Sequence, residues 1–397
     1  MHLPDLRSAV DAAAELVRPS FASVAGTVLA VGVLTRSGVV RPVRPDRLLG
    51  MVGGMLRYGF TVTSGYAAGA ARHPDRTAIL DDAGRLTFGE VHARTDRLAA
   101  ALADTGIGAG SRVGILCRNS RSPVEAQVAL GKLGADAVLL NTGLSPDRLA
   151  AVARELALHT VIADAEFTDL LSGLPAACGR ITAWGAGPVS LEELIEHGGD
   201  TPLPLRPPPG RTIVLTSGTT GTPKGARRPQ VRSLSPAAAV LSAIPLRAGE
   251  AMHVAAPLLH TWGDSALLIA LLHGAPVVLN RRFTPEGFLR SVEEYRCGAV
   301  FAVPVMLQRV LELPAERLGA AWRAHRPRVV AVSGSALPGG LATAFMDRFG
   351  DVLYNLYGST EVSWVSIATP ADLRVSPGTA GRAPFGTRVL ILDGDGR

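Results

Sequence analysis

The sequence predicts an α/β fold built from two layered α/β subdomains, each with a mainly parallel sheet flanked by helices. Between Thr77 and Phe349, short aliphatic or β-branched runs alternate with longer amphipathic segments, a pattern typical of parallel strands covered by helices. Hydrophobic residues make up 47% of the 397 residues and charged residues 19%, so the composition excludes intrinsic disorder. The length exceeds one ordinary domain and predicts about two or three units with sizeable cores.

Short apolar runs mark the expected strands in chain order. They span residues 111–117, 137–140, 160–163, 212–215, 276–279, 299–303 and 328–332. One stretch has the composition of a linker, because six of the ten residues 201–210 are Pro or Gly. We therefore expect a boundary near residue 205, with one α/β subdomain over residues 61–205 and a second over residues 206–376.

Residues 1–60 form an apolar and basic amino-terminal extension. Between Arg18 and Arg36 lie 17 uncharged residues, which include Pro19 and two glycines. A membrane-spanning helix needs about 20 apolar residues, and acidic residues before this run argue against a cleaved signal peptide. Two interpretations stay open: a helix that makes peripheral contact with an anionic membrane through residues 19–60, or a helical cap packed on the first subdomain.

The net charge and the cysteine content limit which binding partners and which cellular compartment we expect. The net charge is +6, from 40 basic and 34 acidic residues, which suits anionic substrates and is too diffuse to indicate nucleic acid. Cys117, Cys178 and Cys297 are odd in number and far apart, and they show neither a disulfide framework nor a zinc-binding spacing. We expect a cytoplasmic protein, membrane-associated if the extension binds lipid, with no nucleic-acid partner.

The most informative segment is TSGTTGTPKG at residues 216–225, directly after the predicted strand 212–215. Its hydroxyl groups, glycines and single lysine are the donors of a polyphosphate-binding loop: Thr216, Ser217, Gly218, Thr219, Thr220, Gly221, Thr222 and Lys224. A nucleotide P-loop ends in Gly-Lys-Ser/Thr, whereas Pro223 precedes the lysine here, so that interpretation fails. A solvated Gly/Thr turn is the remaining alternative.

TSGTTGTPKG resembles the core motif of the adenylate-forming enzymes, which include acyl- and aryl-CoA synthetases, peptide-synthetase adenylation domains and luciferases. The segment YGSTE at residues 357–361 matches the second hallmark of that family. Further matches lie at residues 86–90, 134–141, 256–260, 303–306 and 377–382. The resemblance runs in the family's order from about Gly65 to the end of the chain.

The resemblance implies the following roles in nucleotide binding. Thr216 to Gly221 and Lys224 would hold the β- and γ-phosphates of ATP, and Glu361 would bind Mg²⁺, a hard cation that prefers carboxylate oxygen. Thr360 would contact the α-phosphate, Tyr357 would stack on adenine, and Gly358 would belong to the same nucleotide-binding segment. The loop formed by Gly334, Ser335 and Ala336 would line the adenine and the acyl carbonyl. Thr216, Lys224, Glu361 and His260 are the implied catalytic residues.

The acyl side of the site is implied by the same motifs. The family's histidine after the segment 256–259 borders the acyl pocket, which favours a functional His260, whereas Trp262 fits a pocket gate and a core residue equally well. Pocket positions around residues 256–265, 303–308 and 334–336 are mostly small or apolar. We therefore expect a fatty or other hydrophobic carboxylic acid.

The implied activity is that of an acid-thiol ligase. It would activate the acid with ATP to acyl-AMP, release pyrophosphate, and form a thioester with CoA. Residues 377–397 resemble the start of a small β-rich subdomain, and the carboxyl-terminal domain that carries the family's adenylation lysine is missing from this sequence, so we expect this chain to be impaired. The alternative is a non-catalytic, truncated homologue that binds ATP or an acyl-adenylate.

Overall fold

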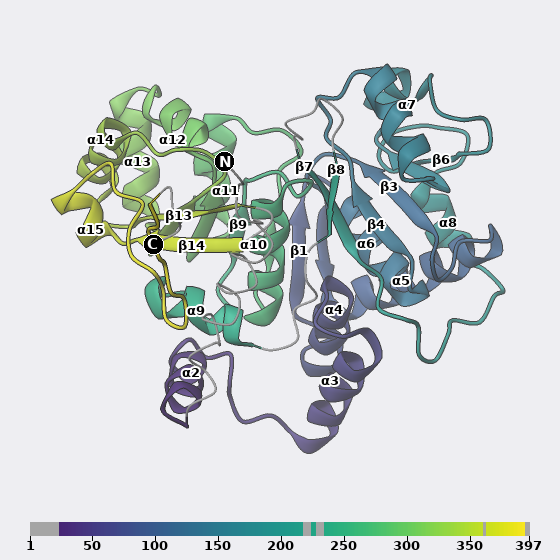
Figure 1. The fold of residues 1–397 in the computed structure, drawn as a ribbon, viewed down its shortest axis with the longest axis horizontal. Helices are drawn as coiled ribbons and strands as arrows, with labels where there is room; N and C mark the ends of the chain where they lie inside the picture. The colour runs from purple at the N-terminus through teal and green to yellow at the C-terminus, as the bar shows by residue number, and fades with distance from the viewer. Residues whose placement is uncertain (1–23, 217–223, 228–233, 360–362, 394–397) are drawn as a thin grey trace, which may run out of the picture.

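The computed structural model describes residues 24–216, 224–227, 234–359 and 363–393 (Figure 1). Over these residues the chain forms two β-sheets with helices packed around each of them. In Figure 1 one sheet lies at the left and centre of the molecule and the other at the right. The predicted α/β class with layered, mainly parallel sheets is confirmed.

The larger sheet has eight strands. In spatial order they are β14 (Ser363–Ala368), β13 (Leu353–Ser359), β12 (Val329–Val332), β11 (Ala299–Ala302), β9 (Met252–Val254), β10 (Val277–Val278), β1 (Thr77–Asp81) and β2 (Gly84–Thr87). Only the outermost pairs, β14–β13 and β1–β2, are antiparallel. The strands predicted at 276–279, 299–303 and 328–332 are therefore confirmed, and all three belong to this sheet.

The smaller sheet has six strands. In spatial order they are β6 (Gly179–Thr182), β5 (Thr160–Ala163), β3 (Arg112–Leu116), β4 (Asp136–Leu139), β7 (Thr212–Thr216) and β8 (Lys224–Arg227). All pairs are parallel except β7–β8 at one edge. The strands predicted at 111–117, 137–140, 160–163 and 212–215 are confirmed.

Helices cover both sheets and connect their parallel strands. They are α4 (Val62–Arg72), α5 (Phe88–Asp104), α6 (Arg121–Leu133), α7 (Pro146–Glu155), α8 (Leu191–His197), α9 (Ser235–Ala243), α10 (Thr261–Leu272), α11 (Pro285–Glu294), α12 (Pro304–Leu311), α13 (Ala315–Ala324), α14 (Gly339–Phe349), α15 (Pro370–Val375) and the 3₁₀ helix η2 (Ala165–Leu171). Several begin where the sequence supplies a cap. Thr61, Thr87, Ser190 and Thr369 each accept the N–H of the residue three positions on, whose side chain caps in return.

The division between the two sheets differs from the predicted boundary near residue 205. Strands β1 and β2 precede that boundary, yet they close the edge of the eight-stranded sheet beside β10. Strand β7 follows the boundary, yet it pairs with β4 of the six-stranded sheet. A Pro/Gly-rich stretch marks where the chain bends, but strand pairing decides which sheet a strand joins, and pairing is not local in sequence.

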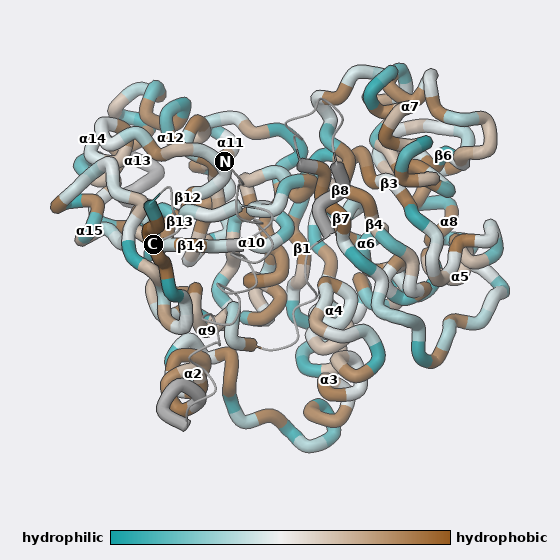
Figure 2. The backbone as a smooth tube through the Cα atoms, in the orientation of Figure 1, coloured by the Kyte–Doolittle hydropathy of each residue, from teal (hydrophilic) through white to brown (hydrophobic). Residues whose placement is uncertain are grey.

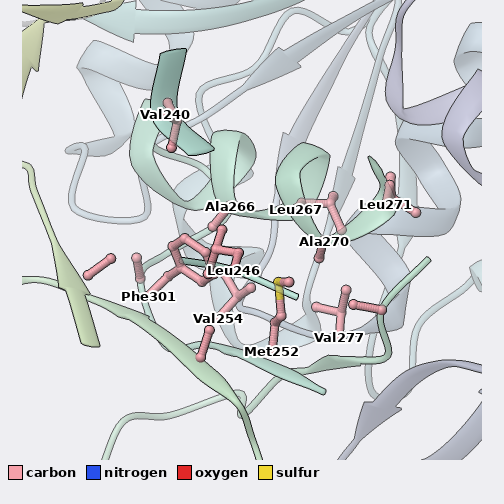
Figure 3. Packing of buried hydrophobic residues seen from close by; sticks show 14 of the residues in the cluster. Val240, Leu246, Met252, Val254, Ala266, Leu267, Ala270, Leu271, Val277 and Phe301 are labelled. Carbon is pink, nitrogen blue, oxygen red and sulfur yellow. The ribbon is translucent and has the colours of Figure 1, made fainter. Parts of the chain in front are cut away.

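The largest hydrophobic core lies between the eight-stranded sheet and α10. In Figure 3, Leu267 and Ala270 of α10 lie close to Met252 and Val277 of the sheet. All four side chains are buried. Helix α10 reads TWGDSALLIALL, so it is apolar on nearly every side and is fixed by burial rather than by amphipathicity. This core sets the position of the loop that leads into α10.

Two helices from the amino-terminal extension lie below the sheets in Figure 1, apart from each other: α2 (Val24–Arg36) near α9, and α3 (Pro45–Tyr58) beside α4. Val33 and Leu34 of α2 belong to the main core. Helix α3 packs closely on α4, since a Cβ at Gly54 would lie 3.2 Å from Ala67 Cβ. None of the helices in the described ranges is long and apolar enough to cross a membrane.

Candidate functional site

Strands β7 and β8 hold both ends of the segment predicted to bind phosphate. They pair antiparallel in continuous register from Ile213 with Arg227 to Thr216 with Lys224. Ser217, Gly218, Thr219, Thr220 and Gly221 lie outside the described residues. The segment is therefore the connection of a β-hairpin, and the sheet brings the backbones of its first hydroxyl residue and its lysine opposite each other.

The carboxyl-terminal edge of the eight-stranded sheet gathers the other predicted residues. Strands β12 and β13 are parallel, with Val332 opposite Asn355, so the chain following β12 and the end of β13 lie at the same edge. Gly334, Ser335 and Ala336 follow β12, while Tyr357 and Gly358 end β13. In doubly wound α/β folds ligands bind at this edge of a sheet.

Gly334 has a backbone conformation that requires glycine. Its φ of +93° lies in the region that L-residues with a Cβ rarely adopt. A Cβ there would meet only Val303 Cγ1, at 3.6 Å, so space is not the constraint. Ser333 before it is buried, whereas Ser335 and Ala336 are exposed. The turn at Gly334 therefore brings the next two residues out of the sheet and onto the edge.

Tyr357 presents an open aromatic ring at this edge. Its side chain is 56% exposed, whereas Tyr58, Tyr66 and Tyr354 are buried. The pairing of β13 with β14 shifts register between Tyr357 and Gly358, which bends the strand end. An exposed ring at the carboxyl end of β13 is available for stacking on a planar ligand.

His260 lies on the loop between β9 and α10. It is the N-cap residue of α10, and its backbone N–H donates to Pro257 O at 3.1 Å. The residue is exposed at the surface, yet neighbouring protein displaces enough water from the imidazole to lower its pKa below the usual 6.5. A neutral ring suits the edge of a pocket for an anionic or apolar group.

Trp262 is buried and packs in the main core, as the core alternative predicts. Its ring packs edge-on against Phe301 with centroids 5.5 Å apart, and Nε1 donates to Ala302 O at 2.9 Å. Gly263 beside it is packed against the same loop, since a Cβ there would overlap the carbonyl oxygen of Pro257. No sequence pattern distinguishes this glycine, because its role depends on a contact made by the folded loop.

Asn119 is a further residue that sequence reasoning missed. It follows β3 of the six-stranded sheet, is buried, and hydrogen-bonds the loop before α10. The available signal was a polar residue directly after a buried strand, where parallel-sheet proteins often place functional side chains.

The predicted magnesium ligand, Glu361, and its neighbour Thr360 lie outside the described residues. Within the described ranges no group of three or more His, Cys, Asp or Glu side chains could hold a metal. Magnesium commonly uses one or two carboxylates together with the oxygens of a bound phosphate, so a dedicated cluster is not required. The single carboxylate of Glu361, as the sequence gives it, is compatible with that donor set.

The chain belongs to the AMP-binding enzyme family, whose model matches residues 66–397. The matched region contains both sheets, the β7–β8 hairpin and the edge that carries Gly334, Tyr357 and His260.

Three relatives illustrate the range of that similarity. A feruloyl-CoA synthase from Amycolatopsis sp. is 30% identical over 82% of this chain and 65% of its own length. A medium/long-chain-fatty-acid–CoA ligase from Mycobacterium tuberculosis is 29% identical over 82% of this chain and 54% of its own length. The crystal structure of a protein described as a long-chain-fatty-acid CoA ligase, from Rhodopseudomonas palustris, has a TM-score of 0.71 and 26% identity over 85% of this chain and 84% of that one. This chain thus spans less than two thirds of the length of the first two relatives.

Proposed function

We propose that this chain acts in the ATP-dependent activation of a carboxylic acid to an acyl-adenylate, followed by thioester formation with CoA. The observation that carries the proposal is the β7–β8 hairpin, which closes the hydroxyl- and glycine-rich segment between Thr216 and Lys224. Membership of the AMP-binding family supports it. The proposed class is an acid-thiol ligase with ATP, Mg²⁺ and CoA as its partners.

The first step needs no general base, because a carboxylic acid is already ionised near neutral pH. A carboxylate oxygen forms a bond to the α-phosphorus of ATP, the bond from that phosphorus to the bridging oxygen breaks, and pyrophosphate leaves. In the second step the sulfur of CoA bonds to the acyl carbon, AMP leaves with the anhydride oxygen, and the thiol proton passes to solvent. Catalysis therefore depends on the positioning of the reactants and on neutralisation of the negative charge on the triphosphate.

Each predicted residue has a proposed task in that scheme. Thr216 to Gly221 and Lys224 would bind the phosphates that leave as pyrophosphate, and Mg²⁺ held by Glu361 would neutralise charge on the triphosphate. Tyr357 would stack on adenine, for which its exposed ring is available. Gly334, Ser335 and Ala336 would border the nucleotide, Thr360 would contact the α-phosphate, and neutral His260 would border the acyl group.

The proposed acid is hydrophobic, with a fatty acid as the leading candidate. Val303 lies beside Gly334, and Val305 in the first turn of α12 is 52% exposed although it is apolar. An acyl chain that covers this exposed apolar side chain, next to the sheet edge proposed to bind the nucleotide, would remove apolar surface from water and so favour binding. The relatives named for feruloyl and fatty acyl substrates show that both classes of acid occur among similar proteins.

Carboxylate-dependent exchange of labelled pyrophosphate into ATP tests the proposal directly. Exchange with octanoate or another hydrophobic acid, absent without the acid, is the expected result for the full protein. Binding of ATP or an acyl-adenylate analogue with no exchange for any acid would favour the alternative, a non-catalytic binding protein. Failure to bind ATP at all would overturn both.

We also propose that α3 contacts the surface of an anionic membrane, in the cytoplasmic location predicted from the cysteines. The outer face of α3 is apolar: Leu49 is 74% exposed and Leu56 84%, and Leu48 and Val52 are exposed beside them (Figure 2). Residues 24–60 contain five arginines and one aspartate, a charge excess that complements anionic lipid.

Contacts on the opposite side fix the orientation of α3. Gly50 and Gly54 face Ala71 and Ala67 of α4. Arg57 donates to Pro204 O at 2.7 Å, so the helix is tied to the body of the protein while its leucines point outward. An apolar outer face, basic neighbours and a fixed orientation are the features of a helix that binds at a membrane surface.

A further inference from the structure

Asn119 joins the six-stranded sheet to the loop that carries His260. It lies three residues beyond the end of β3 and is only 6% exposed. Its Nδ2 donates to Val254 O at 3.1 Å and to Ala256 O at 3.0 Å. Its Oδ1 accepts the N–H of Leu258 at 2.8 Å. One side chain therefore fixes three backbone positions of a loop that belongs to the other sheet.

The pattern of these hydrogen bonds requires a primary amide. Two carbonyl oxygens need donors and one N–H needs an acceptor, and only an amide group supplies both at this reach. The reversed amide would place NH₂ against the N–H of Leu258 and oxygen against two carbonyls, so the network itself sets the orientation. An aspartate could serve Leu258 but would set a negative charge against two carbonyl oxygens.

The loop is held on its other sides as well. The N–H groups of Ala255 and Ala256 both donate to Phe301 O of β11 at 2.9 Å. Gly263 in the first turn of α10 leaves just enough room for Pro257 O. Asn119 adds three side-chain hydrogen bonds to residues 254–258 from the opposite sheet. The position of His260 at the end of the loop thus depends on a residue of the opposite sheet.

We propose that Asn119 is a positioning residue for the acyl side of the site: it sets the loop 255–260 against the carboxyl-terminal edge of the eight-stranded sheet and so shapes the pocket for the acid. The inference deepens the proposed function and rests on it. It assigns Asn119 no contact with ATP, so loss of its side chain affects recognition of the acyl group and leaves the nucleotide site in place.

The matched control is Asp81, which also joins the two sheets. Its carboxylate is buried and pairs with Arg121 of α6 at 2.6 Å, two residues beyond Asn119. This ion pair touches β1 and not the loop before α10. Asp81→Asn therefore weakens the link between the sheets without removing a hydrogen bond from residues 254–258.

The test compares the affinities of the full protein for octanoyl- and benzoyl-sulfamoyl-adenosine with its affinity for AMP, by calorimetry. Asn119→Ala is expected to weaken the better acyl analogue about tenfold or more, since up to three hydrogen bonds are lost, and to change AMP binding less than twofold. Gly263→Ala, which pushes the same loop from its other side, is expected to give the same selective loss. Asp81→Asn is expected to lower thermal stability with no selective loss.

Each of the other outcomes shows whether the inference alone or the proposed function is wrong. Equal loss for acyl analogue and AMP, or the same selectivity in Asp81→Asn, would show that Asn119 is a general structural residue and overturn the inference alone. An unmodified protein that binds neither analogue more tightly than AMP would overturn the proposed function, and the inference with it. Should Asn119→Ala fail to fold, Gly263→Ala and Asn119→Ser decide by the same comparison.

Discussion

Thr216 and Lys224 are the last paired residues of the β7–β8 ladder, opposite each other where the hairpin opens. A lysine at this position stands out in this chain, because only two of its 40 basic residues are lysines and the rest are arginines. The second one, Lys132, is fully buried, and its ammonium donates to Asp96, Thr95 and the backbone of His92. The two lysines therefore have different environments and can be compared within one molecule.

Acylation of lysines by a small amine-reactive ester should be blocked by ATP at Lys224 only. Bound phosphates would cover the amine and stabilise its charged, unreactive form, so we expect saturating ATP to slow modification of Lys224 about tenfold or more. Burial lowers the pKa of Lys132 to about 8, but the absence of solvent contact should leave it unmodified in the folded protein. Peptide mass spectrometry with and without ATP measures both sites. Equal rates at Lys224 in both conditions would contradict the phosphate-binding role.

Gly334→Ala should weaken ATP binding by moving the exposed residues after it. A Cβ at a φ of +93° costs about 1 to 2 kcal/mol, so the loop must either bear that strain or relax and displace Ser335 and Ala336. We expect a fall in unfolding free energy of that size and an increase in the KM for ATP of about fivefold or more.

Gly340→Ala is the matched control for Gly334→Ala. Gly340 lies in the first turn of α14, and a Cβ there would meet nothing within 4 Å. Alanine in a helix is favoured over glycine by up to about 1 kcal/mol, so this variant should be neutral or stabilising with an unchanged KM. A similar rise in KM in both variants would show that the turn at Gly334 has no specific role.

The sequence predicted seven of the strands in the described part of the chain, because buried parallel strands are short, continuous apolar runs, as at 160–163 and 299–303. It placed Gly334 after the predicted strand 328–332, whereas β9 and β13, whose ends carry His260 and Tyr357, were not predicted as strands. It could not assign β1 and β7 to their sheets, since that choice depends on pairing between strands far apart in the chain.

The residues that sequence reasoning missed share a different property. Asn119 hydrogen-bonds the loop before α10, which is far from it in sequence. Gly263 lies against the same loop, which folds tightly onto it. Neither residue type is unusual after a strand or at the start of a helix. Their roles follow from three-dimensional packing, which local pattern and propensity do not encode.

Replacing Leu49 and Leu56 with glutamate should strongly weaken binding of the protein to anionic vesicles. Each apolar side chain of this size contributes roughly 1.5 to 3 kcal/mol when removed from water, so the double variant should bind at least about tenfold more weakly to phosphatidylserine-containing vesicles in a flotation assay. Val375→Glu is the control, because Val375 is 88% exposed and lies at the end of α15, away from α3. Equal binding by the unmodified protein and the double variant would exclude α3 as the contact.

His253 should make the protein less stable in mild acid. Its ring is fully buried in β9, 5.3 Å from the ring of Phe288, and neither nitrogen makes a hydrogen bond of normal geometry. Burial lowers its pKa from 6.5 to about 4, and the nearby amide of Asn280 offsets only part of that shift. The unfolded chain therefore takes up a proton that the folded protein excludes.

The sign and the size of the effect follow from that difference. The stabilisation from neutral His253 is fully present above pH 6.5 and is lost as the pH falls toward 4, by an amount on the order of 3 kcal/mol. Urea unfolding at a series of pH values for the unmodified protein and for His253→Gln isolates the contribution, because other histidines titrate in both. The unmodified protein should lose more stability than the variant across this window. Parallel curves would show that the pKa of His253 is the same in the folded and the unfolded chain, and would contradict the prediction.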